Sequence, residues 1–266
     1  YACVALRGLE RPNPLHLLIA FCYIFAAYIW SRMAQKQLDE LNAPPRVAFH
    51  MRSPKLQLAL TCGAAGASLA ISAMLGRAET LLLGAAYAIA LAYNIPFGPR
   101  RLRFRRLKDI PASKDLFTAA AWATVAAVIP GISRSSAAAG GALPVVLAAV
   151  VVFILAFVRA TMFDFTDIQG DRLLGRETLP VLLGARRTRV YLAILTIVLA
   201  CILAVGSAAG VFTSLGWWLL PVPAGILVAL FPLFSPLTRS ELVCPLVADG
   251  FLLLTGAIAA AWRMAG

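Results

Sequence analysis

Long, uninterrupted apolar runs dominate this chain, and polar or basic segments separate them. A helix of about 20 apolar residues crosses the roughly 30 Å hydrocarbon core of a bilayer. The runs do not alternate with a period of two, as the strands of a membrane barrel would. The pattern therefore predicts an all-α transmembrane helical bundle of about eight spans in a single domain, residues 1–266. The expected spans are residues 14–33, 56–75, 80–97, 115–131, 140–163, 188–211, 215–235 and 243–262.

Composition excludes several classes of protein. Hydrophobic residues make up 61% of the 266 positions and charged residues only 14%, against about 25% charged in ordinary soluble domains. The mean hydropathy is +0.84. A soluble fold cannot hide so much apolar surface from water, so a soluble enzyme, a disordered chain and a single-span receptor are all excluded. The five cysteines show no paired spacing and predict neither a disulfide nor a metal site.

Positive charge is concentrated in three long segments between the apolar runs. The chain carries 24 Lys and Arg against 12 Asp and Glu, a net charge of +12. The basic segments are residues 34–55, residues 98–114 and the connection between the fifth and sixth runs, and alternating spans place all three on one face. Because loops rich in Lys and Arg stay in the cytoplasm, we expect a bacterial inner-membrane protein whose basic face is cytoplasmic and contacts anionic lipid headgroups. Topology thus explains the charge without a nucleic-acid partner.

Three carboxylates mark the end of the fifth run. Asp164, Asp167 and Asp171 are spaced i, i+3 and i+7, which places them within roughly 60° of one another on a helix. Like charges so close to hydrocarbon repel one another and are poorly solvated. A divalent cation resolves both problems, and Mg²⁺ prefers such oxygen ligands together with substrate phosphates. The alternative is a solvated helix end whose acids face Arg172 and Arg176.

The stretch from Asp164 to Gly184 reads DFTDIQGDRLLGRETLPVLLG. It resembles the second aspartate-rich motif, DxxDxxxD, and its usual continuation in the UbiA superfamily of intramembrane prenyltransferases. This resemblance implies a nine-span helical bundle, of which the first helix is expected to be missing before Tyr1. It also implies that Asp164, Asp167 and Asp171 are catalytic and hold Mg²⁺ on a prenyl diphosphate, with Arg172 contacting the substrate.

The first aspartate-rich motif of the family, NDxxDxxxD, is degenerate in this chain. The run Asp39-Glu-Leu-Asn42-Ala-Pro-Pro-Arg46 resembles the segment that follows that motif and sets the register. On this register Asp39 keeps the last acid, whereas Ser31, Arg32 and Gln35 replace the Asn and two acids. The resemblance still implies substrate contacts from Asp39, Asn42 and Arg46.

Loss of two acids leaves three outcomes open. In the first, one metal suffices and nearby cations such as Arg32, Lys36 or Arg46 take over phosphate contacts. In the second, the substrate is an unusual phosphorylated lipid. In the third, catalysis is lost. In related proteins a Tyr and a basic residue in the loop before the fourth span lie near the diphosphate, which implies this role for Tyr93 and Lys108.

Further polar residues allow a structural and a functional interpretation. Lys114 and Asp115 form a helix-start pair that Ser113 can cap. Asp249 lies inside the eighth run, where it either binds an acceptor hydroxyl in a central cavity or hydrogen-bonds a neighbouring helix.

The sequence therefore supports one main functional hypothesis and two alternatives. The first is a Mg²⁺-dependent prenyltransferase that moves an isoprenyl group from a prenyl diphosphate to an aromatic or other lipophilic acceptor, as in quinone biosynthesis. The second is a catalytically degenerate subunit, or a quinone- or isoprenoid-binding module, with protein partners in a membrane complex. The third is a transporter or channel that uses intramembrane acids as ion sites.

Overall fold

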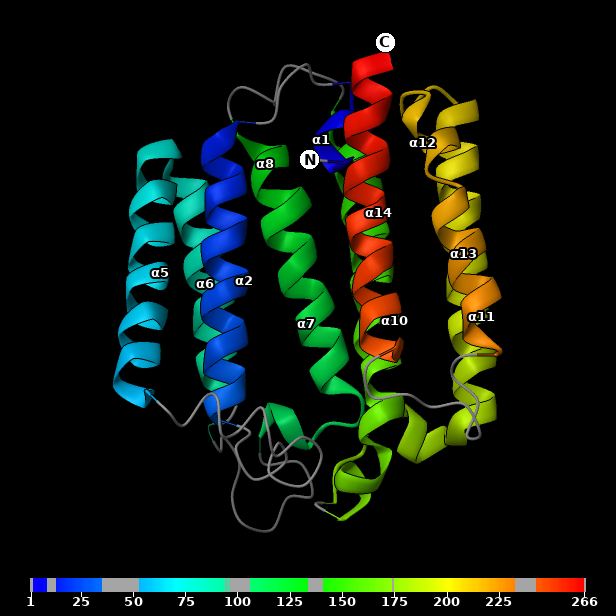
Figure 1. Cartoon of the computed structure of the whole chain (residues 1–266). Helices are drawn as coiled ribbons and strands as arrows, with labels where there is room; N and C mark the ends of the chain where they lie inside the picture. The colour runs from blue at the N-terminus through cyan, green and yellow to red at the C-terminus, as the bar shows by residue number, and fades with distance from the viewer. Residues whose placement is uncertain are drawn as a thin grey trace.

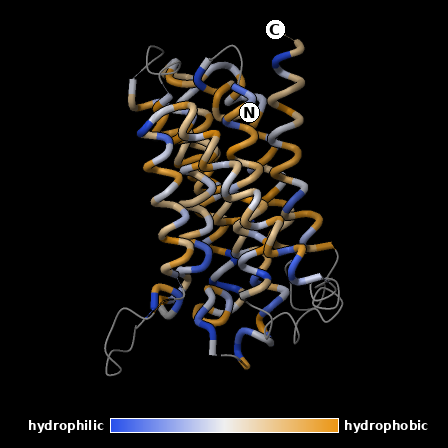
Figure 2. Tube along the Cα trace, turned by 90° about the vertical axis from the view of Figure 1, so that its left-hand side faces the viewer, coloured by the Kyte–Doolittle hydropathy of each residue, from blue (hydrophilic) through white to orange (hydrophobic). Residues whose placement is uncertain are grey.

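The computed structural model of this chain describes residues 2–8, 13–34, 53–93, 95, 106–133, 141–173, 175–232 and 243–265. Within these ranges the backbone is helical, without strands, and the long helices run side by side along one direction (Figure 1). The predicted all-α bundle is therefore confirmed. Apolar residues fill its middle, and hydrophilic residues gather towards its two ends (Figure 2), as a membrane-spanning bundle requires.

Each of the eight predicted spans contains helix. The elements in chain order are α1 (Ala2–Leu6), α2 (Pro14–Ala34), α5 (Pro54–Leu75), α6 (Arg77–Ala92), the 3₁₀ turn η1 (Leu107–Asp109), α7 (Ser113–Ala123), the π-helical turn η2 (Thr124–Val128), α8 (Ile129–Ile132), α10 (Ala142–Leu173), α11 (Leu179–Ala208), α12 (Leu215–Trp218), α13 (Pro221–Leu230) and α14 (Val243–Ala265).

Six stretches among the described residues are long and apolar enough to cross a membrane. They are α2, α5, the continuous helix from Ser113 to Ile132, α10, α11 and α14. The predicted third and seventh spans are shorter helices. The third becomes α6, which begins with the charged residues Arg77 and Glu79, and the seventh is split into α12 and α13 before Pro221, because proline cannot continue a helical hydrogen-bond ladder.

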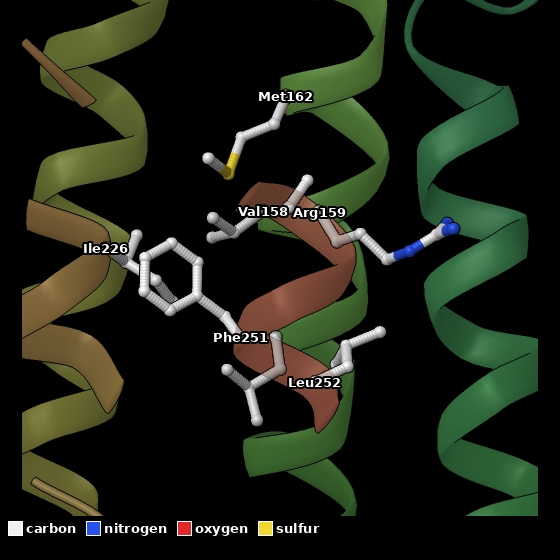
Figure 3. A pocket seen from close by; sticks show the side chains of 8 residues that line it. Val158, Arg159, Met162, Ile226, Phe251 and Leu252 are labelled. Carbon is white, nitrogen blue, oxygen red and sulfur yellow. The ribbon is translucent and has the colours of Figure 1, made fainter. Parts of the chain in front are cut away.

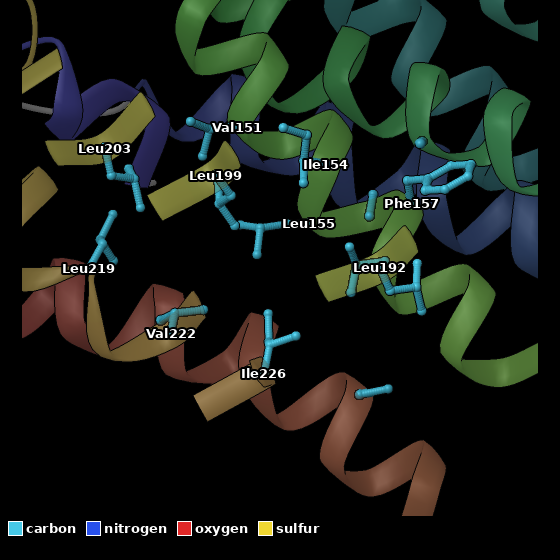
Figure 4. Packing of buried hydrophobic residues seen from close by; sticks show 14 of the residues in the cluster. Val151, Ile154, Leu155, Phe157, Leu192, Leu199, Leu203, Leu219, Val222 and Ile226 are labelled. Carbon is cyan, nitrogen blue, oxygen red and sulfur yellow. The ribbon is translucent and has the colours of Figure 1, made fainter. Parts of the chain in front are cut away.

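Helix α10 organises the larger hydrophobic core. Side chains such as Leu155 and Phe157 pack there against Leu192 and Leu199 of α11 and against Ile226 of α13 (Figure 4). A second cluster of buried residues joins α2, α6, η2 and α8, and it consists of Ile19, Tyr23, Leu83, Val125 and Ile129. Other large apolar side chains point outward, as Met74, with 79% of its surface exposed, and Leu253, with 74%, illustrate. Outward-facing apolar residues are expected where the solvent is lipid.

The helix ends that adjoin the three basic segments lie at one end of the bundle. In Figure 1 α2 and α6 end there, α5 and α7 begin there, and α10 and α11 meet there. α10 continues to Leu173, ten residues past the predicted end of its span at residue 163. The three predicted acids therefore sit on the same continuous helix as the span, and their spacing is a true helical spacing.

Candidate active site

The three acids of α10 lie at this end of the bundle, with different exposure. Asp164 and Asp171 are completely buried, whereas Asp167 is half-buried. The first turn of α7 faces them with Lys114 and the buried Asp115. The Nζ of Lys114 donates to Oδ1 of Asp164 at 2.5 Å. Packing of α7 against α10 thus brings one cation and four carboxylates into one region.

The second acid of α7 is held by a hydroxyl of α10. Thr161 Oγ1 donates to Oδ2 of Asp115 at 2.9 Å, and Thr161 is itself fully buried. This bond fixes Asp115 one helical turn from Asp164, because residues three apart on a helix share a face. Sequence reasoning interpreted Lys114 and Asp115 only as a helix start and so missed them as site residues. The signal was present, since a Lys-Asp pair opens an apolar helix that follows a basic loop.

Several carboxylate oxygens of this site remain without a hydrogen bond. Among the described residues, Oδ1 of Asp115, Oδ2 of Asp164 and both carboxylate oxygens of Asp171 are buried and accept no hydrogen bond. A buried carboxylate with unpaired oxygens is costly. Lys114 compensates only part of this negative charge, so the arrangement favours binding of a cation or of a ligand that brings one.

A magnesium ion shared with a substrate fits this donor set. In the described part of the chain no three His, Cys, Asp or Glu side chains form a group that could hold a metal by themselves. Mg²⁺, however, is usually bound by one or two carboxylates, with water and substrate phosphates completing its octahedral shell. The unpaired oxygens of Asp164 and Asp171 match that requirement.

Tyr93 lies beside this cluster. It follows the last residue of α6, and its hydroxyl is 3.1 Å from the hydroxyl of Ser113. Burial raises the pKa of the Tyr93 phenol, and Lys114, Asp115 and Arg176 are among the charges that act on it. The phenol therefore stays protonated at neutral pH and can donate a hydrogen bond. The expected Ser113 cap of α7 is wrong: the capping position is Ala112, with a left-handed φ of 55° and no side-chain cap bond, because the Ser113 hydroxyl faces Tyr93.

The basic residues suggested by the resemblance occupy different positions. Lys108 is exposed on η1, and its backbone N–H donates to the Tyr93 carbonyl at 3.2 Å, which ties η1 to the site. Arg172 is exposed at the end of α10. Arg176 lies closer to the acids, because its backbone N–H donates to the Asp171 carbonyl at 2.8 Å and its charge acts on the Asp171 carboxylate.

Only part of the degenerate first aspartate-rich motif lies among the described residues. Ser31 and Arg32 lie in the last turn of α2, where the Arg32 guanidinium is 5.6 Å from the centre of the Tyr28 ring. The remaining residues of that motif and of the segment after it, Gln35, Lys36, Asp39, Asn42 and Arg46, lie outside the described residues.

An apolar cavity of about 250 Å³ lies deeper in the bundle. Its wall includes Val152 and Leu155 of α10, Trp122 of α7 and Leu252 of α14. Nine residues of α10 separate Asp164 from Leu155, a rise of about 13 Å. The acids and the cavity therefore follow one another along α10, with charged groups at the end of the bundle and apolar groups within it. Asp249, which the sequence placed either in a cavity or against a helix, forms an ion pair with Arg159 of α10.

Comparisons with known proteins agree with this arrangement. The family model described as the UbiA prenyltransferase family matches residues 1–241. Among solved structures, the chain is similar to the apo structure of a UbiA homolog from Aeropyrum pernix K1, with a TM-score of 0.68 and 18% identity over 95% of this chain and 94% of that one. At this identity the likeness shows the fold alone. A comparison with curated proteins found no match. Because the family match covers most of its length, this integral membrane protein belongs to the UbiA prenyltransferase family, a family of intramembrane prenyltransferases.

Proposed function

We propose that this chain is a Mg²⁺-dependent enzyme that transfers an isoprenyl group from a prenyl diphosphate to an aromatic or other lipophilic acceptor. The observation that carries the proposal is the set of buried, unpaired carboxylate oxygens beside Lys114, about 13 Å along α10 from an apolar cavity. A prenyl diphosphate has the same division, with a charged head and a long apolar tail. Members of this family are generally metal-dependent, which agrees with the acidic site.

The polar end of the site would bind and orient the diphosphate. Asp164 and Asp171 would hold Mg²⁺, which when bound supplies positive charge against the leaving diphosphate. Asp167 would complete the set from its half-buried position. Lys114 neutralises Asp164 and so limits repulsion between the acids and the phosphate oxygens. The protonated Tyr93 hydroxyl would donate a hydrogen bond towards a phosphate oxygen.

The mouth of the site would be lined by further cations. Arg176 and the exposed Lys108 and Arg172 would attract the diphosphate from solution, with Asp39, Asn42 and Arg46 contributing from the segment that follows α2 in the sequence. In the transfer, the bond between prenyl C1 and the diphosphate oxygen breaks and the diphosphate leaves with its electron pair. The acceptor then forms a bond to C1 and loses a proton. We propose that the basic face is cytoplasmic in a bacterial inner membrane and that residues 1–266 act as one domain.

Metal-dependent release of diphosphate tests this function. Purified protein in lipid nanodiscs is incubated with geranyl, farnesyl and geranylgeranyl diphosphate and a crude lipid extract as the acceptor source. We expect release that requires Mg²⁺ and falls by at least about 10–100-fold in Asp171→Asn, because loss of a group that merely supports a metal ligand already costs that much. Gln169→Ala, an exposed position on the same helix, is the matched control and should release diphosphate like the wild type.

The first motif supports a second candidate function. Ser31 and Arg32 stand where the family has an Asn and an acid, so a protein that binds an isoprenoid or quinone without converting it remains a specific alternative. Saturable binding of a prenyl lipid together with no diphosphate release above the Asp171→Asn background would favour this binding module and contradict the enzyme.

A further inference from the structure

An ion pair joins α10 and α14 inward of the acidic site. Arg159 of α10 donates from Nε to Oδ1 of Asp249 on α14 at 2.6 Å. About 23% of the Arg159 side chain and 48% of the Asp249 side chain are exposed, although both helices are apolar spans. A buried or intramembrane ion pair adds little net stability, since desolvation offsets most of the attraction. Such residues within spans more often mark a substrate pathway.

Two aromatic rings hold the guanidinium. The Arg159 Cζ atom lies 4.6 Å from the centre of the Phe163 ring and 5.2 Å from the centre of the Trp122 ring, both within the range of cation–π attraction. Figure 3 shows Arg159 leaving α10 and extending towards the helix that carries Trp122. The guanidinium is therefore fixed among α7, α10 and α14, with its orientation set before any ligand arrives.

The pair has hydrogen-bonding capacity left. Within the described part of the chain, Arg159 donates only through Nε, so both terminal NH₂ groups make no hydrogen bond, and Oδ2 of Asp249 accepts none. An arginine presents five N–H donors in a rigid fork, and a carboxylate oxygen accepts further bonds. One ligand atom can therefore accept from Arg159 while its own proton is donated to Asp249.

The position of Arg159 along α10 suits the binding of an acceptor. Arg159 lies five residues, about 7.5 Å, inward from Asp164. It lines a pocket of only about 10 Å³, and its guanidinium extends away from that pocket towards α7 (Figure 3). The separate cavity of about 250 Å³ is lined by Leu155, Leu252 and Trp122, and it approaches the volume of small ligand pockets, about 300 Å³. The Trp122 ring, which lines this cavity, lies 5.2 Å from the Arg159 guanidinium. A planar ring bound in this cavity against Trp122 would therefore reach the pair with its polar group.

We infer that the Arg159–Asp249 pair binds the hydroxyl of an uncharged, planar acceptor such as a phenol or a quinol, and that it discriminates against acceptors bearing a carboxylate. The pair is neutral as a whole, so a hydroxyl satisfies its donors and acceptor without adding charge. A carboxylate would leave a net negative charge in a low-dielectric interior near four further carboxylates, which is costly. This inference rests on the proposed function, because it names the acceptor of that same site.

Equilibrium binding of a matched pair of probes tests the inference. The probes are 2-naphthol and 2-naphthoate, which share one ring system and differ in the polar group; binding is measured at neutral pH with the full chain in nanodiscs. We expect the wild type to bind 2-naphthol about tenfold more tightly, because the negative charge of 2-naphthoate would not be compensated by the neutral pair. Wild-type binding that favours 2-naphthoate, or no saturable binding of either probe, would overturn the inference.

Charge substitution provides the sharper readout. In Asp249→Asn the Arg159 charge is no longer neutralised, so the preference should invert towards 2-naphthoate. In Arg159→Gln both probes should bind more weakly, 2-naphthoate most of all. If the pair had only a structural role, both probes would lose the same affinity in each variant, and that result would contradict the inference. Arg263→Gln, a cation in the last turn of the same α14, is the control and should bind like the wild type.

The proposed enzyme function and the proposed acceptor site can be refuted independently. These binding measurements need neither a prenyl diphosphate nor turnover. Inverted preference in Asp249→Asn without any diphosphate release would support the acceptor site and overturn the enzyme. Diphosphate release together with unchanged probe preference in both variants would overturn the acceptor site and leave the enzyme standing.

Discussion

Lys114 places a positive charge among buried carboxylates at the end of the bundle. Its partner Asp164 is completely buried, while 28% of the Lys114 side chain remains exposed. Removing one member of a buried pair leaves an uncompensated charge, which costs more than the pair itself contributes. Lys114 therefore belongs both to the stability of the α7–α10 contact and to the electrostatics of the site.

The effect on stability is measurable by thermal unfolding in detergent. We expect Lys114→Met to lower the free energy of unfolding by about 3 kcal/mol, the lower end of the range for a broken buried pair, because Lys114 is partly exposed. Adding Asp164→Asn should restore most of this loss, since the unpaired charge is then removed. Lys55→Met, at an exposed lysine of α5, is the control and should change stability by less than about 0.5 kcal/mol. An unaltered melting temperature in Lys114→Met would show that the pair is not coupled to folding.

Helix α11 contains a sharp change of direction near its beginning. Gly184 has a φ of 76°, in the left-handed region, although it lies within the continuous stretch from Leu179 to Ala208. A Cβ atom at Gly184 would meet no atom within 4 Å. The need for glycine here is thus conformational and not a matter of space, since an L-residue with a side chain is disfavoured at such a φ.

A pair of glycine substitutions separates the effect of backbone conformation from the effect of available space. We expect Gly184→Ala to lower the free energy of unfolding by about 1–2 kcal/mol, the cost of forcing a side chain into the left-handed region. Gly66→Ala in α5 also meets open space, but the position is an ordinary helical one. It should raise stability by up to about 1 kcal/mol, because alanine favours helix over glycine. Equal effects of the two substitutions in detergent would refute the conformational explanation.

The sequence predicted much of the element pattern and less of the site. Each long apolar run contains helix as predicted, because lipid leaves helix as the way to satisfy the backbone of such a run. Only six stretches of the described residues are long and apolar enough to cross a membrane, however, since α6 and the α12–α13 pair are shorter. The predicted fifth span ends at residue 163, because the apolar run ends where Asp164 begins, although helix α10 continues to Leu173. The spacing of the three acids is a helical one on α10, and their joint role stays a prediction. Lys114 and Asp115 were missed as site residues because they join the acids only through packing of α7 on α10.

At the scale of the whole molecule, the ends of the bundle differ in charge and chemistry. The described carboxylates of the site, Tyr93 and η1 lie at the end where α6 stops and α7 starts, while α11 ends and α12 begins at the opposite end (Figure 1). An intramembrane enzyme with a charged substrate needs such an asymmetry, since the diphosphate must enter from water on one side. On the positive-inside rule we propose that this side faces the cytoplasm.

Accessibility of introduced cysteines tests this orientation. In a variant without the five native cysteines, we expect Lys108→Cys on η1 to react with an impermeant maleimide only in inverted membrane vesicles. Ala209→Cys, an exposed position just after α11, should react only in intact cells. The two sites are thus internal controls for each other. The reverse pattern of labelling would place the candidate active site on the outer side.

The π-helical turn η2 has a consequence for how the span that starts at Ser113 can change. A π turn holds one residue more than a regular turn, so Thr124–Val128 sets the rotation of Ile129 relative to Lys114. Deleting one residue there would restore a regular helix and leave the two halves nearly aligned, whereas a regular helix formed by all of the residues would turn one half of the span by about 100° against the other. Either the charged mouth or the packing of Ile129 would then lose its alignment. The π turn thus sets the rotation between the two halves of the span. One helix can therefore present Lys114 to the charged mouth and Ile129 to its packing partners, although the spacing of the two residues does not match a regular helical repeat.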